Sequence, residues 1–152
     1  MKKRGEPALV LGQFLPYRLV SLSQRISNSL SAIYREQFGI SVPEWRILAN
    51  LADRGELYPK EIAQQTSMDK AKVSRAIKEL SGKRLVLKRS DRSDHRAYRL
   101  RLSVSGFALY RKIVPLALAW EAGLLGALDA AEQRDLLRII NKLSRHVDDG
   151  NV

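Results

Sequence analysis

Several kinds of residue are missing from this chain of 152 residues, or rare in it. It has no cysteine, which excludes disulfide bonds, thiolate metal sites, cysteine nucleophiles and redox sensing by a thiol. Its only two histidines, His95 and His146, are far apart in the sequence and make a poor metal site. The longest unbroken apolar run, 113–120, is far shorter than the ~20 residues that span a bilayer. We therefore expect neither a metal site nor a membrane partner.

Sequence signatures of catalysis are missing as well. The chain has no glycine-rich phosphate loop and no nucleophile elbow. Its acidic residues fall mainly at expected helix caps or on solvent-facing positions. We therefore expect no enzyme and no cofactor.

The first sixteen residues begin with three basic side chains and continue with a few apolar ones, as a signal peptide does. Glu6, Pro7, Gly12 and Gln13 interrupt the apolar stretch, and no small-residue cleavage site follows. We expect no export signal and a cytoplasmic location.

Positive charge is what the chain has in excess. It carries 27 Lys and Arg against 16 Asp and Glu, a formal net charge of +11. Apolar residues make up 45% and charged residues 28%, which is typical of a globular protein, and the length suits a single domain, 1–152. A basic protein approaches polyanions readily, and nucleic acid is the first candidate.

Apolar spacing predicts helices in the first half of the chain. Between Pro16 and Gly39, apolar residues recur every three or four positions, as on one face of a helix. Ser41 and Glu44 have the spacing of a capping box, which predicts a second helix that ends near 54–55. Pro59 opens a short helix, and Asp69 caps another. Three short helices joined by tight connections predict a helix-turn-helix.

The apolar period then changes to two, which predicts strands. The segment 85–89 reads as one strand, and 98–102 reads as another, in which Arg99 and Arg101 face solvent. The polar turn 90–97 joins them into a hairpin, or wing, beside the helix-turn-helix. The predicted DNA-binding lobe is 41–102.

Both ends of the chain are predicted to be helical and broadly apolar. A helix is expected from Ser103 or Ser105 to about Leu128, and a second capping box at 129–132 opens another helix. A winged helix-turn-helix has too small a core to cover these apolar stripes. We therefore expect 14–38 and 103–148 to pack together and against a second copy, giving a mainly α fold with a small β-hairpin wing and flanking dimerisation helices.

Most of the excess charge falls on the predicted lobe. Residues 60–101 hold 13 basic and five acidic side chains, a net charge of +8. Helical spacing turns Val73, Ala76, Ile77 and Leu80 inward, and the outward residues are candidates for DNA contact. The candidates on the recognition helix are Lys70, Lys72, Ser74, Arg75 and Lys78.

These candidates have different expected roles. Arg75 can donate two hydrogen bonds to a guanine edge, and Lys72 can reach guanine or phosphate. For Lys78 a phosphate contact, which carries no sequence information, is favoured. On the wing, Arg92, His95 and Arg96 are candidates, since an arginine can enter a narrow minor groove. His95 is more simply an exposed turn residue than a pH switch.

Several segments together resemble the MarR family of bacterial transcriptional regulators. Asp94-His-Arg96, followed after five residues by Leu102-Ser103, resembles that family's wing signature Asp-x-Arg-x5-Leu-Thr. The segments 14–19, 38–45 and 68–80 are similar to further parts of the family pattern, in the same order. Two residues depart from it: Ser103 replaces a threonine, and Arg84 stands where a glycine usually closes the recognition helix. We expect Gly82 to serve in place of that glycine.

The resemblance implies a nucleoid-associated homodimer, expected to be a repressor, that binds a palindromic operator. It implies that Arg96 enters the minor groove and that Asp94 holds it. It also implies release of DNA by a small aromatic carboxylate, for which Tyr17, Arg18 and Trp45 are candidate contacts. The simpler alternative, slightly favoured, is that Arg18 forms a structural ion pair and Trp45 is a core residue. An enzyme, a metal-responsive regulator and an architectural DNA-binding protein without sequence preference are the competing functions.

Overall fold

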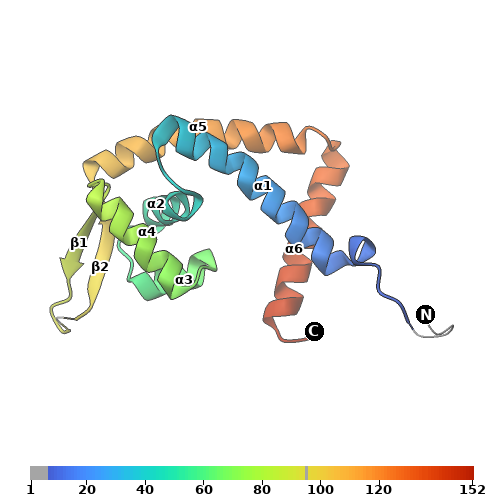
Figure 1. Ribbon diagram of the computed structural model, residues 1–152, viewed down its shortest axis with the longest axis horizontal. Helices are drawn as coiled ribbons and strands as arrows, with labels where there is room; N and C mark the ends of the chain where they lie inside the picture. Colours follow the sequence, from blue (N-terminus) through green and yellow to red (C-terminus); the bar gives the residue numbers. More distant parts are fainter. Residues whose placement is uncertain (1–6, 95) are drawn as a thin grey trace. The chain divides into compact units, whose positions relative to one another are not determined.

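A computed structural model of the protein describes residues 7–94 and 96–152. Contacts divide the chain into two compact units, 1–113 and 114–152. The elements are the 3-10 turn η1 (Leu11–Gln13), helices α1 (Leu15–Phe38), α2 (Val42–Arg54), α3 (Pro59–Thr66) and α4 (Lys70–Gly82), strands β1 (Val86–Ser90) and β2 (Tyr98–Leu102), and helices α5 (Val104–Leu125) and α6 (Ala130–Asp148) (Figure 1). The fold is mainly α with one hairpin, so the predicted fold class is confirmed.

The predicted helix boundaries in the first unit are largely those observed. Pro16 lies in the first turn of α1, and Gly39 ends the helix in the left-handed conformation with φ of 65°. Ser41 Oγ accepts from the Glu44 N–H at 3.3 Å, and Glu44 Oε1 accepts from the Ser41 N–H at 3.1 Å. This capping box opens α2, as the spacing predicts.

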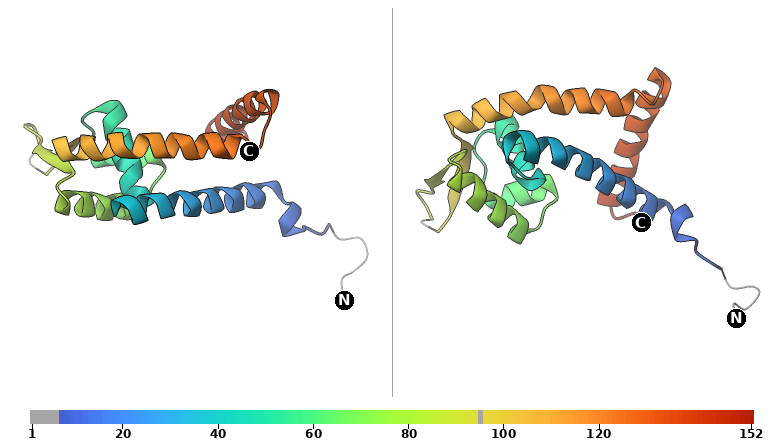
Figure 2. Two further views of the ribbon diagram at one scale, coloured as in Figure 1. Left: turned by 90° about the horizontal axis from the view of Figure 1, so that it is seen from above. Right: turned by 45° about the horizontal axis from the view of Figure 1, so that its top comes forward.

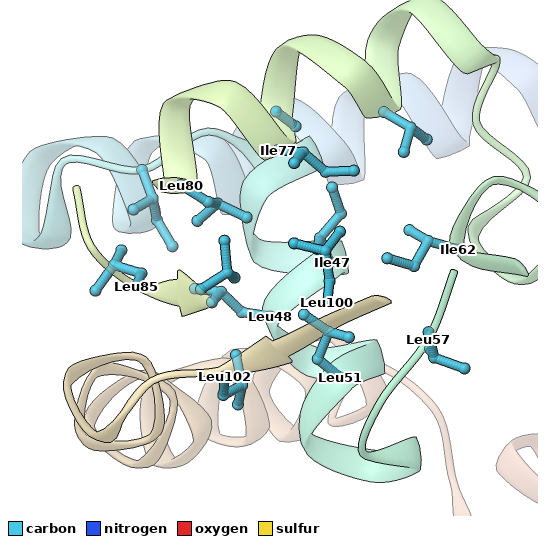
Figure 3. Packing of buried hydrophobic residues seen from close by; sticks show 14 of the residues in the cluster. Ile47, Leu48, Leu51, Leu57, Ile62, Ile77, Leu80, Leu85, Leu100 and Leu102 are labelled. Atoms are coloured by element: carbon cyan, nitrogen blue, oxygen red, sulfur yellow. The ribbon is translucent and has the colours of Figure 1, made fainter. Parts of the chain in front are cut away.

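The core of this unit lies between α2, α3, α4 and the hairpin (Figures 2 and 3). Helix α2 contributes Ile47, Leu48 and Leu51, all 1% exposed or less. Ile62 from α3 and Leu100 from β2 are fully buried against them. Each such side chain contributes roughly 1.5–3 kcal/mol when it leaves water, so this cluster holds the three short helices together.

The hairpin is antiparallel, and its register sorts its side chains onto two faces. Val86 pairs with Leu102, and Arg89 pairs with Arg99. An isolated bridge between Leu57 and Leu100 adds a short third segment beside β2. The first strand begins at Val86, one residue later than predicted. The reason is that the Leu85 N–H donates to Leu80 O at the end of α4.

Ser103 begins α5. Its Oγ accepts from the Gly106 N–H at 3.0 Å, which is an N-cap hydrogen bond, so the helix starts from Ser103 and not from Ser105. The helix ends at Leu125, three residues before the predicted position.

In the second unit, α6 follows the predicted capping box, in which Asp129 and Glu132 exchange hydrogen bonds of 2.8 and 2.9 Å. Its apolar residues are exposed in the single chain, Ile140 at 48% for example. Among the described residues no single helix is long and apolar enough to cross a membrane, and only α5 and α6 taken together reach that length and hydropathy.

Candidate nucleic-acid interface

Helix α4 is the predicted recognition helix, and its two faces are sharply different. Asp69 Oδ1 accepts from the Lys72 N–H at 2.8 Å and caps the helix. The four residues predicted to point inward are buried, with exposures between 0% and 5%. The five predicted contact residues are all exposed: Lys70, Lys72, Ser74, Arg75 and Lys78. One face of α4 therefore holds the helix in the core, and the other presents four cations to solvent.

Arg84 closes the carboxyl end of α4, which corrects the expectation that Gly82 does so. Arg84 adopts the left-handed conformation with φ of 57°, whereas Gly82 is the last helical residue and has no positive φ. The Arg84 N–H donates to Ser81 O and the Leu85 N–H donates to Leu80 O, both at 3.0 Å. This pair of bonds is a Schellman motif, in which glycine is usual because it lacks a Cβ.

Lys83 joins the same end of α4 to the junction of α1 and α2. Its Nζ donates to Glu44 Oε2 at 2.7 Å and to Gly39 O at 2.8 Å. The Glu44 side chain is only 6% exposed, whereas that of Lys83 is 37% exposed. The carboxylate therefore has a charged partner on its solvent side and the Ser41 N–H on its other side, which satisfies a buried charge.

The wing tip carries the other predicted contacts. Arg92 and Arg96 are exposed at the turn between β1 and β2. Asp94 Oδ1 accepts from the Arg96 backbone N–H at 2.9 Å. Asp94 therefore orders the backbone at Arg96, and its role in DNA binding stays a prediction. His95 lies outside the described residues.

A group of polar residues on the outer face of the hairpin was missed by the sequence reasoning. The Tyr58 hydroxyl donates to Asp91 Oδ2, and the Arg99 guanidinium lies 4.8 Å from the centre of the Tyr58 ring. Arg89 and Glu56 form an ion pair with a nitrogen–oxygen distance of 3.5 Å. The alternation in β2 places Arg99 outward, but no local pattern indicates that Tyr58 lies beside it.

Asp91 is the most strongly perturbed acid in the described part of the chain. Its carboxylate accepts from the Tyr58 hydroxyl and from the N–H and Oγ of Ser93, at 2.9 and 2.8 Å for the last two. These hydrogen bonds, with that of Tyr58 the largest cause, hold the pKa of Asp91 well below its ordinary value. The residue is therefore a fixed negative charge among three arginines, Arg89, Arg92 and Arg99, around a shallow hollow.

The three candidate effector contacts do not come together in the chain. Tyr17 and Arg18 lie on an exposed groove along the first turns of α1. Trp45 stacks between Tyr34 and Tyr110, with ring centres 5.3 and 5.7 Å apart. Tyr34 is 16 residues beyond Arg18, which is roughly 24 Å along a helix.

The simpler alternative states that Trp45 is a core residue and that Arg18 forms a structural ion pair. Trp45 packs against the core cluster, as that alternative states. Arg18 has no ion-pair partner among the described residues, so a structural ion pair for it stays a prediction. The described residues also contain no group of three or more side chains that could hold a metal ion.

Comparison with known proteins gives a family match over part of the chain and a similar fold over most of it. Residues 38–97 match the MarR family. The crystal structure of a MarR/EmrR family transcriptional regulator from Acinetobacter sp. ADP1 is 28% identical with a TM-score of 0.84, over 93% of this chain and 99% of that one. BpsR of Bordetella bronchiseptica is 22% identical with a TM-score of 0.80, over 91% and 98%. PcaV of Streptomyces coelicolor is 18% identical with a TM-score of 0.75, over 93% and 99%.

A search of curated protein sequences finds no match. The family match covers the helix-turn-helix and the hairpin turn, and the fold agrees over nearly the whole chain. The resemblance predicted from the sequence is therefore confirmed: part of the chain matches the MarR family, and its winged-helix fold is similar to that of MarR family transcriptional regulators.

Proposed function

We propose that this protein is a transcriptional regulator, a sequence-specific repressor that binds a palindromic operator as a homodimer. The observation that carries the proposal is the division of α4 into a buried apolar face and an exposed basic face beside a wing with two exposed arginines. In such a module the second helix of the helix-turn-helix enters the major groove and the wing follows the adjacent backbone or minor groove. Arg75 and Lys72 are assigned to base edges, and Lys70, Ser74 and Lys78 to phosphates.

The distribution of basic residues supports DNA binding by the same surface. Of the 13 basic residues in 60–101, Lys83 and Arg89 are the two that form ion pairs within the described residues. The remaining cations are free to release counterions from DNA, so binding will weaken steeply with salt.

The homodimer is supported by apolar side chains that are exposed on two of the described helices. On α1 these include Leu19 and Leu22, and on α6 Ile139, Ile140 and Leu143, all at least 43% exposed. Exposed apolar faces of this extent mark interfaces, and a two-fold dimer matches a palindromic site. Light scattering should give about twice 17.2 kDa, and a stable monomer would contradict this arrangement.

An effector is the second part of the proposal. DNA binding by BpsR is regulated by 6-hydroxynicotinic acid, and PcaV was solved with its natural ligand. In this chain Arg18 is an exposed cation that lines the same groove as Tyr17, and this pair of residue types suits an aromatic carboxylate. The groove lies along one helix and is open, so an enclosing wall must come from elsewhere in the dimer. Calorimetry with a panel of aromatic acids, scored by loss of DNA binding, tests this.

The decisive experiment compares affinities. DNA selected from a random library should bind ~10³-fold or more tightly than unselected duplex, and equal affinity would indicate an architectural protein instead. Arg75→Ala should cost about 1–3 kcal/mol on the selected site and relax base choice at one position. A uniform loss over all sequences would assign Arg75 to a phosphate.

A regulator of this kind acts on the chromosome. We place it in the cytoplasm, associated with the nucleoid, and assign it no catalytic role. Hydrolysis or group transfer by the purified dimer would contradict that assignment.

A further inference from the structure

The base of the wing packs in the core through Val86, Leu100 and Leu102, but its tip has few contacts with the rest of the unit. A two-stranded hairpin is marginally stable by itself, and the turn 91–97 lies at its far end. Within the turn, the Asp91 N–H donates to Ala97 O and the Ala97 N–H donates to Asp94 O, both at 3.0 Å. These bonds are local, so they shape the turn without fixing where it points.

One hydrogen bond in the described part of the chain joins this turn to the helix-turn-helix. It runs from the Tyr58 hydroxyl to Asp91 Oδ2, between residues 33 positions apart. The other oxygen of Asp91 accepts from Ser93, so the same carboxylate ties the turn to itself and to Tyr58. A displacement of the tip therefore breaks a charge-assisted hydrogen bond, which is stronger than a neutral one.

Tyr58 is itself held firmly. Its N–H donates to Glu61 Oε2 at 2.7 Å, where it serves as the N-cap of α3. The preceding residue, Leu57, exchanges hydrogen bonds of 2.8 and 3.0 Å with Leu100. The Arg99 guanidinium covers the Tyr58 ring at 4.8 Å. The hydroxyl is therefore presented from a fixed backbone and a ring with restricted motion.

The ion pair between Arg89 and Glu56 runs beside this contact, but both of its residues are partly exposed. Exposed ion pairs contribute little and are screened by salt. Of these two contacts, the hydrogen bond from the Tyr58 hydroxyl to Asp91 is therefore the one that physiological salt weakens less.

We propose that Tyr58 is a positioning residue for DNA binding: its hydroxyl holds Asp91 and thereby sets the wing tip, with Arg92 and Arg96, in the orientation that meets the duplex. Tyr58 acts through the wing and makes no contact with the base edges. Because this hydrogen bond restricts the wing tip before binding, less conformational entropy is lost when DNA binds than would be lost without the bond. The inference rests on the proposed function, because it assigns a role within DNA binding.

The test uses Tyr58→Phe in the full-length protein, which removes one hydroxyl and keeps the ring, the α3 cap and the net charge. The probe is a duplex selected from a random library by the unmodified protein. The expected result is affinity roughly twofold to tenfold weaker, the value of one hydrogen bond. The matched control is Tyr110→Phe, which removes a hydroxyl from the ring stacked on Trp45 and should leave affinity unchanged.

A double-mutant cycle separates positioning from a general structural effect. In a background that carries Arg92→Ala and Arg96→Ala, Tyr58→Phe should cause no further loss, because the wing no longer binds. In an Arg75→Ala background the full loss should persist. In the free protein, amide hydrogen exchange at Ser93 and Arg96 should become faster.

Two results would overturn the inference while leaving the proposed function intact. One is equal affinity of Tyr58→Phe and the unmodified protein. The other is an equal loss with and without the wing arginines. If the unmodified protein selects no duplex at all, the proposed function fails, and the positioning role fails with it.

Discussion

Gly106 should tolerate no side chain. It lies buried in the first turn of α5, where the helix passes directly over the end of α4. A Cβ at this position would overlap the Leu85 carbonyl oxygen, and it would lie 3.1 Å from the Leu85 carbonyl carbon and 3.4 Å from Leu102 Cδ2. The carbonyl oxygen is backbone and cannot rotate away, so Gly106→Ala must push the start of α5 outward.

The size of the effect follows from what that displacement breaks. To reach ordinary contact, the helix must move by roughly 1 Å or more. The Ser103 N–H donates to Leu85 O at 3.0 Å, and Ser103 Oγ donates to Arg84 O at 2.7 Å. A shift of that size takes both bonds beyond hydrogen-bond range. Overpacking costs about 1–3 kcal/mol and each bond about 1 kcal/mol, against up to about 1 kcal/mol gained from replacing glycine in a helix. We expect a net loss of about 2–4 kcal/mol.

Urea unfolding at one fixed protomer concentration measures this loss, since the stability of a dimer depends on concentration. Gly82→Ala is the matched control: it lies in α4, and a Cβ there meets nothing within 4 Å. It should raise stability by up to about 1 kcal/mol. If Gly106→Ala is as stable as the unmodified protein, the close approach of α5 to Leu85 is wrong.

Three further predictions follow from the first unit. Arg84→Gly should raise the free energy of unfolding by up to about 1 kcal/mol, and with it the urea midpoint, because glycine adopts the positive φ without strain. A lower midpoint would show that the arginine side chain stabilises the helix end. Glu44→Gln should cost about 1–3 kcal/mol, discounted because Lys83 is partly exposed, and Glu44→Gln with Lys83→Met should regain part of that loss. Burial raises the pKa of the Tyr34 hydroxyl, and the positive charge of Arg46 partly opposes this. The stability that Tyr34 contributes is therefore fully present below its unfolded pKa of about 10 and is lost as the pH rises through the higher folded pKa. Tyr34→Phe should therefore lose less stability than the unmodified protein above about pH 10, and identical pH profiles would refute the assignment.

Much of the fold could be predicted because its signals are local. A capping box such as Ser41–Glu44 involves residues three apart, and the inward face of α4 follows from helical spacing alone. The alternation in 98–102 likewise predicted which residues of β2 are buried. In each case the residues that determine the structure are neighbours in the sequence.

The parts that were missed depend on contacts between distant residues. Tyr58 and Asp91 are 33 positions apart, and Lys83 and Glu44 are 39 apart, so no periodic pattern connects them. The position of Arg84 at the end of α4, where Gly82 was expected, could not be predicted for a related reason. Glycine is the usual residue at a left-handed position, but the buried Leu80 and Leu85, joined by a backbone hydrogen bond, and the bond from Ser103 to Arg84 O hold Arg84 there.

The two halves of the DNA-binding surface are therefore held with very different strength. Helix α4 is anchored by four buried side chains, of which Val73, Ile77 and Leu80 contribute roughly 1.5–3 kcal/mol each, and by polar contacts at both ends. The wing tip is joined to the same unit by one hydroxyl bond and by an ion pair that solvent screens. Removing the Tyr58 hydroxyl should therefore loosen the wing and leave α4 in place. Base choice at the positions read by α4 should persist in Tyr58→Phe, although the wing's contribution to affinity is reduced.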